Sequence, residues 1–418
     1  MTYNSPMPKE NSLVAIIGQG YVGLPLAIAA VESGWSVVGI DTSDERVGTL
    51  NRGISPVEDV SSRQIQDAIA NGMYRATKNF AEIANADVVA ICVPTPLDSD
   101  RNPDLQPLLS AVRSIEPHTR KGAVVVSEST SYPGTLRNAI IPIFEKGLGF
   151  KDREVYFAAA PERVNPGDQV WNQKNTPRLV GGINPESQQK ALEFYNSICD
   201  SVISVSSPEI AEAGKLLENT FRFVNIALIH EFTQLCDSQD IDVNQVIDAA
   251  STKPYGFMPF RPGVGIGGHC IPVDPLYLTW WANQNGKSAR LVQLADEVSN
   301  AMPTYVASRV MMLTPIRTDN IKVMILGVAY KAGVSDVRET PARALREQLL
   351  NQGCIVEWHD PLVEKWEGSY PVDISWDCDV AVIVTNQPGI DVSYLSNKGI
   401  PILDCTNSYS ALSGVSLI

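Results

Sequence analysis

The 418-residue sequence predicts an α/β protein with two Rossmann-like, doubly wound parallel-sheet domains, joined by a helical middle domain with a long central helix. Three observations predict this fold class. Short runs of Val, Ile and Ala alternate with helical patterns from residue 13 to about 205, one long apolar stripe follows, and a second alternation begins at residue 321. We therefore expect domains at 1–205, 206–305 and 306–418.

The first domain contains seven short β-rich runs. They are LVAIIG, SVVGID, DVVAICVP, AVVVSES, VYFAAAPE, PRLVGG and SVISV. Continuous apolar runs of this length are typical of strands that are buried on both faces, as in a parallel sheet covered by helices on each side.

The central helix is predicted to begin after residue 207. Ser207 suits an N-cap, and Pro208 suits the first helical position. Apolar residues then recur at intervals of three and four, namely Ile210, Ala213, Leu217, Phe221, Val224, Leu228, Phe232 and Leu235. This periodicity indicates a helix of about seven turns. Apolar residues on its other sides favour burial of this helix between domains or subunits.

The third domain repeats the alternation of strands and helices. Its strand candidates are IKVMILGVAY, IVEWHDP, VAVIVT and PILDCTN. Between the first two of these, the segment TPARALREQLLNQG is predicted to form a helix that stops at Gly353.

The composition favours a cytoplasmic protein without a nucleic-acid partner. The net charge of −14 argues against nucleic acid, because phosphate backbones require a basic surface. Seven single cysteines without a C-x-x-C pair are typical of a reducing compartment. The most hydrophobic run, LVAIIGQGYVGLPLAIAAV, is interrupted by Gln19, Tyr21 and Pro25, so it indicates a strand, a turn and a helix, and no membrane association is expected.

A dinucleotide site is predicted after the first strand. Gly18, Gly20 and Gly23 form a G-x-G-x-x-G motif between a strand and a helix, and Asp41 ends the next strand. The glycines allow a tight turn, the approach of a pyrophosphate and close helix–strand packing. Asp41 should accept hydrogen bonds from ribose hydroxyls, which favours NAD over NADP. The alternative is a glycine-rich turn that binds no coenzyme.

Further polar residues follow later strands, where an open α/β sheet places its ligand crevice. Thr95 in CVPTP and Thr130 in SESTSYPGT are candidates for coenzyme or water contacts, and Glu162 and Arg163 lie in AAPERVNPG. The alternatives are an ordinary turn at each Thr and a surface ion pair for Glu162 and Arg163.

Two further pairs of residues are candidates for ligand contacts. Lys215 and Asn219 are four residues apart on the predicted long helix, so they share a face away from the apolar stripe. That face is either solvated or turned towards a crevice, where it would supply one cation and one amide. Lys331 and Arg338 lie between a strand and the start of a helix, where two cations suit a phosphate.

The segment RPGVGIGGHCIPVDP places four glycines and three prolines around Cys270. An inert buried thiol is the usual alternative for a cysteine, but glycines at this density allow a ligand to approach the backbone closely. His269 beside Cys270 raises the question of a metal, yet four histidines without zinc-type spacing argue against one. We therefore expect a reactive thiol and no metal.

Together these motifs resemble the UDP-glucose/GDP-mannose dehydrogenase family over nearly the whole chain. GQGYVGLPLA, VPTP, STSYPGT, PERVNPG, the helix with Lys215 and Asn219, GIGGHCIPVDP and YKAGVSDVRETPA occur in the order and spacing of that family. STSYPGT, PERVNPG and GGHCIPVDPLYLTWWA look most like the branch that acts on UDP-N-acetylhexosamines. Gln19, Arg261 and Val264 depart from the residues common in that branch, which concerns substrate detail and not the chemistry.

The resemblance implies a four-electron oxidation of a sugar primary alcohol to a carboxylate by two NAD⁺, for surface polysaccharide or glycan synthesis. The first oxidation gives an aldehyde, to which the Cys270 thiolate adds, and the second gives a thioester that water hydrolyses. By the same resemblance, Lys215 and Asn219 stabilise the oxyanions, and Asp274 holds a water or Lys215 in place.

The resemblance also implies the remaining site residues. Glu162, with Thr130, positions or activates the hydrolytic water. The expected coenzyme site comprises Gly18, Gly20, Tyr21, Val22, Gly23, Asp41, Arg46, Pro94, Thr95, Ser129 and Thr130. The expected substrate site comprises Glu162, Arg163, Lys215, Asn219, Tyr255, Arg261, Gly267, Lys331 and Arg338, with Lys253 as a weaker candidate. Family members can share substrate contacts across an interface on the long helix, so we expect a homodimer or a higher homo-oligomer.

The expected substrate is UDP-N-acetylglucosamine, with UDP-N-acetylmannosamine and UDP-glucose as alternatives. Two other functions stay open at this point. One is a two-electron dehydrogenase of a hydroxy acid in which Cys270 has no part, and the other is a nucleotide-sugar-binding protein without turnover. Two NADH per sugar would distinguish the four-electron enzyme from the first, and any NADH production from UDP-sugars would exclude the second.

Overall fold

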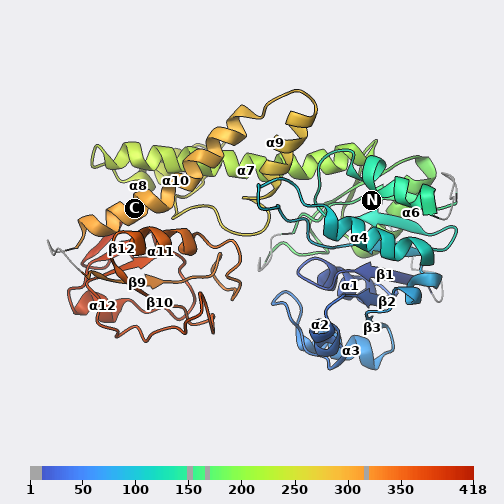
Figure 1. Cartoon of the computed structure of the whole chain (residues 1–418), viewed down its shortest axis with the longest axis horizontal. Helices are drawn as coiled ribbons and strands as arrows, with labels where there is room; N and C mark the ends of the chain where they lie inside the picture. The colour runs from blue at the N-terminus through green and yellow to red at the C-terminus, as the bar shows by residue number, and fades with distance from the viewer. Residues whose placement is uncertain (1–11, 148–153, 165–169, 315–319) are drawn as a thin grey trace. The chain divides into compact units, whose positions relative to one another are not determined.

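The computed structural model describes residues 12–147, 154–164, 170–314 and 320–418. The chain divides into two compact units, residues 1–218 and 219–418, and the division falls inside one long helix (Figure 1). Each unit contains a mainly or wholly parallel sheet with helices on both faces, so the predicted fold class is confirmed.

The first unit is built on an eight-stranded sheet in the order β3-β2-β1-β4-β5-β6-β7-β8. Its strands are β1 (Leu13–Ile17), β2 (Ser36–Ile40), β3 (Tyr74–Thr77), β4 (Val88–Ile91), β5 (Val124–Ser127), β6 (Tyr156–Ala159), β7 (Arg178–Gly182) and β8 (Val202–Ser204). Ile17 on β1 pairs with Ile40 on β2 and with Ile91 on β4, so the strands of the glycine motif and of Asp41 end side by side.

Helices cover both faces of this sheet. They are α1 (Gly23–Glu32), α2 (Asp44–Asn51), α3 (Ser62–Ala70), α4 (Gln106–Ile115), α5 (Ile141–Gly147) and α6 (Pro185–Ile198). Alternate strand residues pack on α1, α3 and α6 in one core and on α4 and α5 in the other. The inner strands are therefore buried on both faces, which explains their uninterrupted apolar runs, whereas the edge strands β3 and β8 have exposed residues.

The sheet departs from the sequence prediction at two places. The short strand β3 was not predicted, because its residues YRAT include an exposed arginine and lack a long apolar run. The pair β6 and β7 is antiparallel, with Ala158 opposite Gly182. In the described part of the connection between them there is no helix. An antiparallel pair of strands needs no crossover helix, unlike a parallel pair.

The long helix α7 spans Pro208–Asp237, 30 residues, in agreement with the predicted start and periodicity. Its apolar stripe, however, is not covered by the chain itself. Ile210, Leu217, Phe221, Leu228, Phe232 and Leu235 are all exposed. The opposite face is buried, because Leu216, Phe223 and Ala227 on that side contribute to the cores. The helix is thus buried on the side that the stripe does not occupy.

The second unit contains α8 (Val243–Ser251), α9 (Asp274–Gln284) and α10 (Arg290–Met312), followed by a sheet and two helices. The sheet order is β10-β9-β11-β12-β13, and every pair is parallel. The elements are β9 (Lys322–Leu326), α11 (Pro341–Asn351), β10 (Ile355–His359), β11 (Val380–Ile383), α12 (Ser393–Asn397), β12 (Ile402–Asp404) and β13 (Val415–Leu417). The helices α10 and α11 pack on one face of this sheet and α12 on the other (Figure 1).

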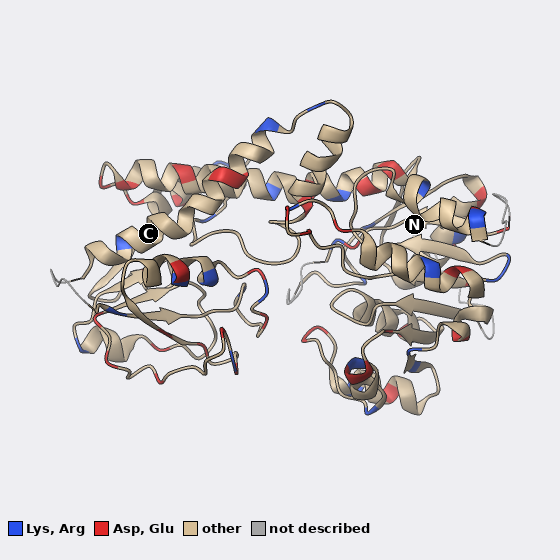
Figure 2. Ribbon diagram, in the orientation of Figure 1, with Lys and Arg blue, Asp and Glu red and all other residues tan. Residues whose placement is uncertain are grey.

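Charged residues of both signs are scattered over the ribbon of each unit (Figure 2). Among the residues described, no helix combines the length and the apolar character that crossing a bilayer requires.

Candidate active site

The turn between β1 and α1 has the geometry that the glycine motif predicts. Gly18 has a φ of +92°, and an added Cβ would lie 2.5 Å from the carbonyl oxygen of Cys92. At Gly23 an added Cβ would lie 1.8 Å from the carbonyl oxygen of Gly18, so glycine is required for the strand–helix packing. A Cβ at Gly20 would meet nothing within 4 Å. This open position at the helix start fits the pyrophosphate of a dinucleotide.

Asp41 is fixed at the end of β2. Its Oδ2 accepts from the backbone N–H of Gln19 at 3.0 Å, and its Oδ1 accepts from the backbone N–H of Ser43 at 3.0 Å. Arg46 donates to the carbonyl oxygen of Gln19 at 3.1 Å, and its Nε lies 3.8 Å from Asp41 Oδ2. The carboxylate therefore joins the glycine turn to the start of α2.

Gln19, which departs from the family pattern, has a fully buried side chain. Its Oε1 accepts from the Tyr74 hydroxyl at 2.8 Å, and its Nε2 donates to the carbonyl oxygen of Ile16 at 2.9 Å. A Cβ at Gly39 would lie 2.6 Å from the Gln19 amide group and 2.9 Å from the Tyr74 oxygen. Glycine at position 39 thus provides the space for this polar residue, which the sequence pattern did not reveal.

The loops after β4 and β5 are joined by hydrogen bonds. The Thr95 hydroxyl donates to the carbonyl oxygen of Thr130 at 2.7 Å, and the Ser129 hydroxyl donates to that of Val93 at 2.7 Å. The structure therefore brings together the segments CVPTP, which contains Pro94, and SESTSYPGT. The carboxylate of Glu212, on α7, accepts from the backbone N–H groups of Gly134 and Leu136 and so anchors the second loop.

Glu162 lies after β6 in a dense set of donors. Its Oε1 accepts from the backbone N–H groups of Arg163 and Val164, and its Oε2 accepts from Arg178 at 2.7 Å. Burial alone would raise the pKa of Glu162, but Arg178, the Val164 N–H group and Lys215 outweigh burial and hold this pKa below its ordinary value. The last residues of PERVNPG, 165–167, lie outside the described residues.

Arg163 itself forms an ion pair with Glu218 and donates to the carbonyl oxygen of Pro177. Its guanidinium group therefore fixes the loop after β6 to α7 and to the start of β7, within the first unit.

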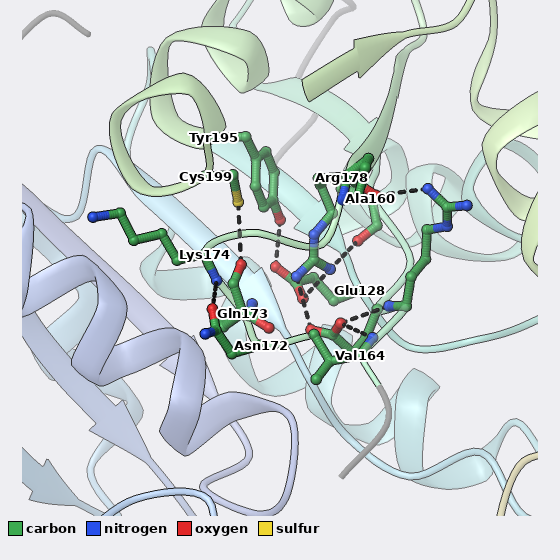
Figure 3. Close-up of polar contacts among 12 residues, drawn as sticks. Glu128, Ala160, Val164, Asn172, Gln173, Lys174, Arg178, Tyr195 and Cys199 are labelled. Carbon is green, nitrogen blue, oxygen red and sulfur yellow. Dashed lines mark hydrogen bonds and ion pairs between the residues drawn. The ribbon is translucent and has the colours of Figure 1, made fainter. Parts of the chain in front are cut away.

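Sequence reasoning missed three buried residues that are linked to the Glu162 carboxylate through Arg178. Arg178, Glu128 and Tyr195 form a buried polar cluster. Figure 3 shows the Arg178 guanidinium group beside Glu128, and the Tyr195 hydroxyl pointing to the same carboxyl group. Burial raises the pKa of Glu128 to about 7. The signal available in the sequence was an arginine at the head of the strand PRLVGG, where a continuous apolar run was expected.

Lys215 and Asn219 are buried on α7, with 8% and 5% of their surfaces exposed. The solvated-face interpretation of this pair is therefore wrong. Within the second unit, the Asn219 amide donates to Asp274 Oδ2 at 2.5 Å. Asp274, expected to hold a water or Lys215, thus orients the Asn219 amide.

The glycine-rich loop around Cys270 packs on the loop before α11. A Cβ at Gly267 would lie 2.9 Å from the Pro341 side chain, and one at Gly268 would lie 3.0 Å from the Tyr330 ring. The backbone N–H of Gly268 donates to the carbonyl oxygen of Glu339. Cys270 is exposed, whereas the other six cysteines are buried, so the alternative of an inert buried thiol is wrong for Cys270.

The same contact region joins His269 to the candidate phosphate ligands. His269 Nε2 lies 3.5 Å from Asp336 Oδ2, and the guanidinium group of Arg338 donates to both oxygens of Asp336 at 2.7 to 3.2 Å. Lys331 belongs to the same loop, which leads into the N-terminus of α11. These cations and the helix start provide the chemistry of an anion site.

The other candidate substrate residues lie after α8. Tyr255 is exposed and lies under the Lys253 ammonium group, which is 4.9 Å from the centre of its ring. Arg261 forms an ion pair with Asp248 and donates to Asn244.

Among the described residues, no group of three or more His, Cys, Asp or Glu side chains is arranged to hold a metal ion.

Comparison with known families gives matches along most of the chain. The UDP-glucose/GDP-mannose dehydrogenase family matches with its NAD-binding domain at residues 12–199, its central domain at 209–301 and its UDP-binding domain at 324–410. A UDP-N-acetyl-D-glucosamine 6-dehydrogenase of Pseudomonas aeruginosa is 35% identical over 87% of this chain and 86% of its own length. A UDP-N-acetyl-D-mannosamine dehydrogenase of Methanococcus aeolicus is 36% identical over 89% of this chain and 83% of its own length.

Solved structures show the same similarity. The UDP-D-ManNAc dehydrogenase of Pyrococcus horikoshii has a TM-score of 0.88 at 30% identity and covers 97% of this chain and 98% of its own. The UDP-N-acetyl-mannosamine dehydrogenase Cap5O of Staphylococcus aureus has a TM-score of 0.85 at 30% identity, with 97% of each chain covered.

Proposed function

Because the chain belongs to the UDP-glucose/GDP-mannose dehydrogenase family and is an NAD-dependent UDP-sugar dehydrogenase, we propose that it oxidises the C6 primary alcohol of a UDP-N-acetylhexosamine to the carboxylate in two successive steps. The observation that carries this proposal is the exposed Cys270 in a glycine-rich loop, four residues before Asp274, which orients the Asn219 amide. A two-electron dehydrogenase needs no such thiol.

NAD⁺, when bound, accepts one hydride from the sugar carbon in each of the two oxidations. The turn at Gly18, Gly20 and Gly23 would hold its pyrophosphate, and Asp41 its ribose. Thr95, Ser129 and Thr130, with Tyr21, Val22, Arg46 and Pro94, would complete that site.

Cys270 supplies the covalent step. Its thiolate adds to the aldehyde carbon and forms a thiohemiacetal, and loss of a hydride from that carbon leaves a thioester. Water then attacks the acyl carbon, the C–S bond breaks, and the products are the uronate and the free thiolate. The oxyanions of these intermediates need donors, and Lys215 and the Asn219 amide would supply them at about 3–4 kcal/mol each.

Glu162 and Thr130 would position the hydrolytic water. Because the pKa of Glu162 is held low, its carboxylate stays ionised at neutral pH and can accept a hydrogen bond from water. The nucleotide phosphates would bind to Lys331, Arg338 and the N-terminus of α11, and Arg163, Tyr255, Arg261 and Gly267 would contribute to sugar recognition.

We also propose that the protein is a homodimer that uses the apolar stripe of α7. A row of six large exposed apolar side chains on one helix face is unusual for a monomer, and a second copy of the same helix is complementary to it. The interface would bury these side chains in both protomers.

A UDP-sugar panel tests the proposed function. We expect the purified full-length protein to produce two NADH per UDP-N-acetylglucosamine consumed, together with the corresponding uronate. UDP-N-acetylmannosamine and UDP-glucose form the other arms of the panel and identify the sugar. One NADH per sugar would support a two-electron dehydrogenase, and no NADH with any of these sugars would support a binding protein without turnover.

A further inference from the structure

Arg178 is among the largest fully buried side chains of the chain, with 2% of its surface exposed. It occupies the first position of β7, and its guanidinium group donates hydrogen bonds to two acidic side chains. Nη1 donates to Glu128 Oε2 at 3.0 Å, and Nη2 donates to Glu162 Oε2 at 2.7 Å. Nη1 also donates to the carbonyl oxygen of Ala160 at 3.2 Å (Figure 3).

The two acids do not have the same surroundings. Glu128 accepts from the Tyr195 hydroxyl at 2.5 Å, and burial raises its pKa to about 7. Glu162 accepts two backbone N–H groups in addition to Arg178 and is held ionised. Glu162 is therefore the more readily ionised of the two acids that contact Arg178.

The hydrogen bonds of Glu162 restrict where a water can bind to it. A carboxylate offers about four acceptor positions, and three of them are taken by Arg178 and by the N–H groups of Arg163 and Val164. Room is left for about one further donor. The orientation of that remaining position depends on Arg178, because Arg178 is the side chain that holds Oε2.

We propose that Arg178 is a positioning residue for thioester hydrolysis: it orients the Glu162 carboxylate so that its remaining acceptor position receives the attacking water. This inference rests on the proposed function. Arg178 touches neither substrate nor coenzyme in this role and acts only through Glu162. Glu128 also accepts from the guanidinium group, whose Cζ lies 5.5 Å from the centre of the Tyr195 ring. Lys215, Cys92 and Cys199 are further titratable groups near the cluster.

The proposal predicts which step fails when Arg178 is replaced. Arg178→Lys keeps the charge, but one ammonium group cannot reproduce the two-pronged contact with both acids. Both oxidations precede hydrolysis, so we expect a burst of two NADH per active site followed by turnover at least 100-fold slower than that of the wild type. Intact-protein mass spectrometry should show the acyl adduct on Cys270, and wild type under the same conditions should not accumulate it.

Arg75→Lys is the matched control. Arg75 lies on β3 of the same unit and pairs with Glu82 at the surface, so this substitution should leave the burst, turnover and mass spectrum unchanged. Arg178→Met, which also removes the charge, should accumulate the adduct at least as strongly, and the thermal midpoint and NAD⁺ affinity of each variant show whether it is folded.

A double-mutant cycle separates positioning from general stability. If Arg178 acts through Glu162, the double variant Arg178→Lys/Glu162→Gln should hydrolyse the thioester no more slowly than Glu162→Gln alone. Additive losses, wild-type turnover of Arg178→Lys, or a first oxidation slowed as much as hydrolysis would overturn the proposal. Absence of NADH from the wild type with every UDP-sugar would instead refute the proposed function, and the assignment of Arg178 with it.

Discussion

The dimer proposal makes a quantitative prediction for Leu228, in the middle of the α7 stripe. This side chain is 58% exposed in the single chain. Full burial of a leucine side chain contributes about 1.5–3 kcal/mol, so covering the exposed part contributes about 1–1.7 kcal/mol. In a two-fold dimer one substitution removes two such side chains. Leu228→Ala should therefore weaken the dimer by about 2–3 kcal/mol, or about 30-fold or more in the dissociation constant.

Sedimentation velocity over a dilution series of the full-length protein measures this constant. Leu350→Ala is the control, because Leu350 is an exposed leucine of α11 at 40% exposure and is not part of the stripe. We expect the control to dimerise as wild type does. A Leu228→Ala dimer as tight as wild type, or a wild type that stays monomeric at micromolar concentration, would refute the reasoning.

Four further predictions follow from the structure. Cys270→Ser should retain NAD⁺ affinity but form uronate more than about 10³-fold more slowly, because the thiolate that accepts the acyl group is gone. Cys378→Ser, a substitution of a buried cysteine, is the control and should be active. Normal uronate yield from Cys270→Ser would exclude the thioester route. Asp41→Ala should weaken NAD⁺ about tenfold in a calorimetric titration, and unchanged affinity would exclude the ribose assignment. His230 is fully buried, and burial lowers its pKa from 6.5 to about 4, so protonation of His230 favours the unfolded chain. As the pH falls from 7 to 4, the free energy of unfolding of the wild type should therefore decrease by about 3 kcal/mol relative to that of His230→Leu. Denaturant titrations measure this difference, and a difference that does not change with pH would contradict the prediction. Asp336→Ala removes the contact between Asp336 and His269, the residue before Cys270, and should at least double the rate at which iodoacetamide alkylates Cys270. An unchanged rate would exclude a coupling between the Asp336–His269 contact and the Cys270 thiol.

The sequence was most informative where one physical cause acts locally. The strand runs beside Gly18 and Asp41 were predicted because strands buried on both faces need apolar residues at every position. The glycine turn was predicted because backbone contacts closer than 3 Å exclude any side chain at Gly18 and Gly23. Both features depend on segments that are contiguous in the chain.

Features that depend on distant segments were not predictable. Arg178 and Glu128 are 50 residues apart, and nothing in either local pattern indicates a shared ion pair. Helical spacing alone could not show whether Lys215 is buried or solvated, because spacing places residues on a face of the helix without showing what covers that face. The antiparallel direction of β7 relative to β6 likewise depends on the path of the long connection between these two strands.

The double anchoring of Asp41 bears on any attempt to redesign this enzyme for a phosphorylated coenzyme. Exchanging the acidic residue for a neutral one is the usual first step, since it removes the charge that repels a 2′-phosphate. In this chain the same exchange would also release the Gln19 and Ser43 amides, and with them the glycine turn and the start of α2. If Asp41 binds the ribose as proposed, coenzyme selectivity and loop rigidity both depend on this one side chain, and a successful redesign would have to replace both contributions together.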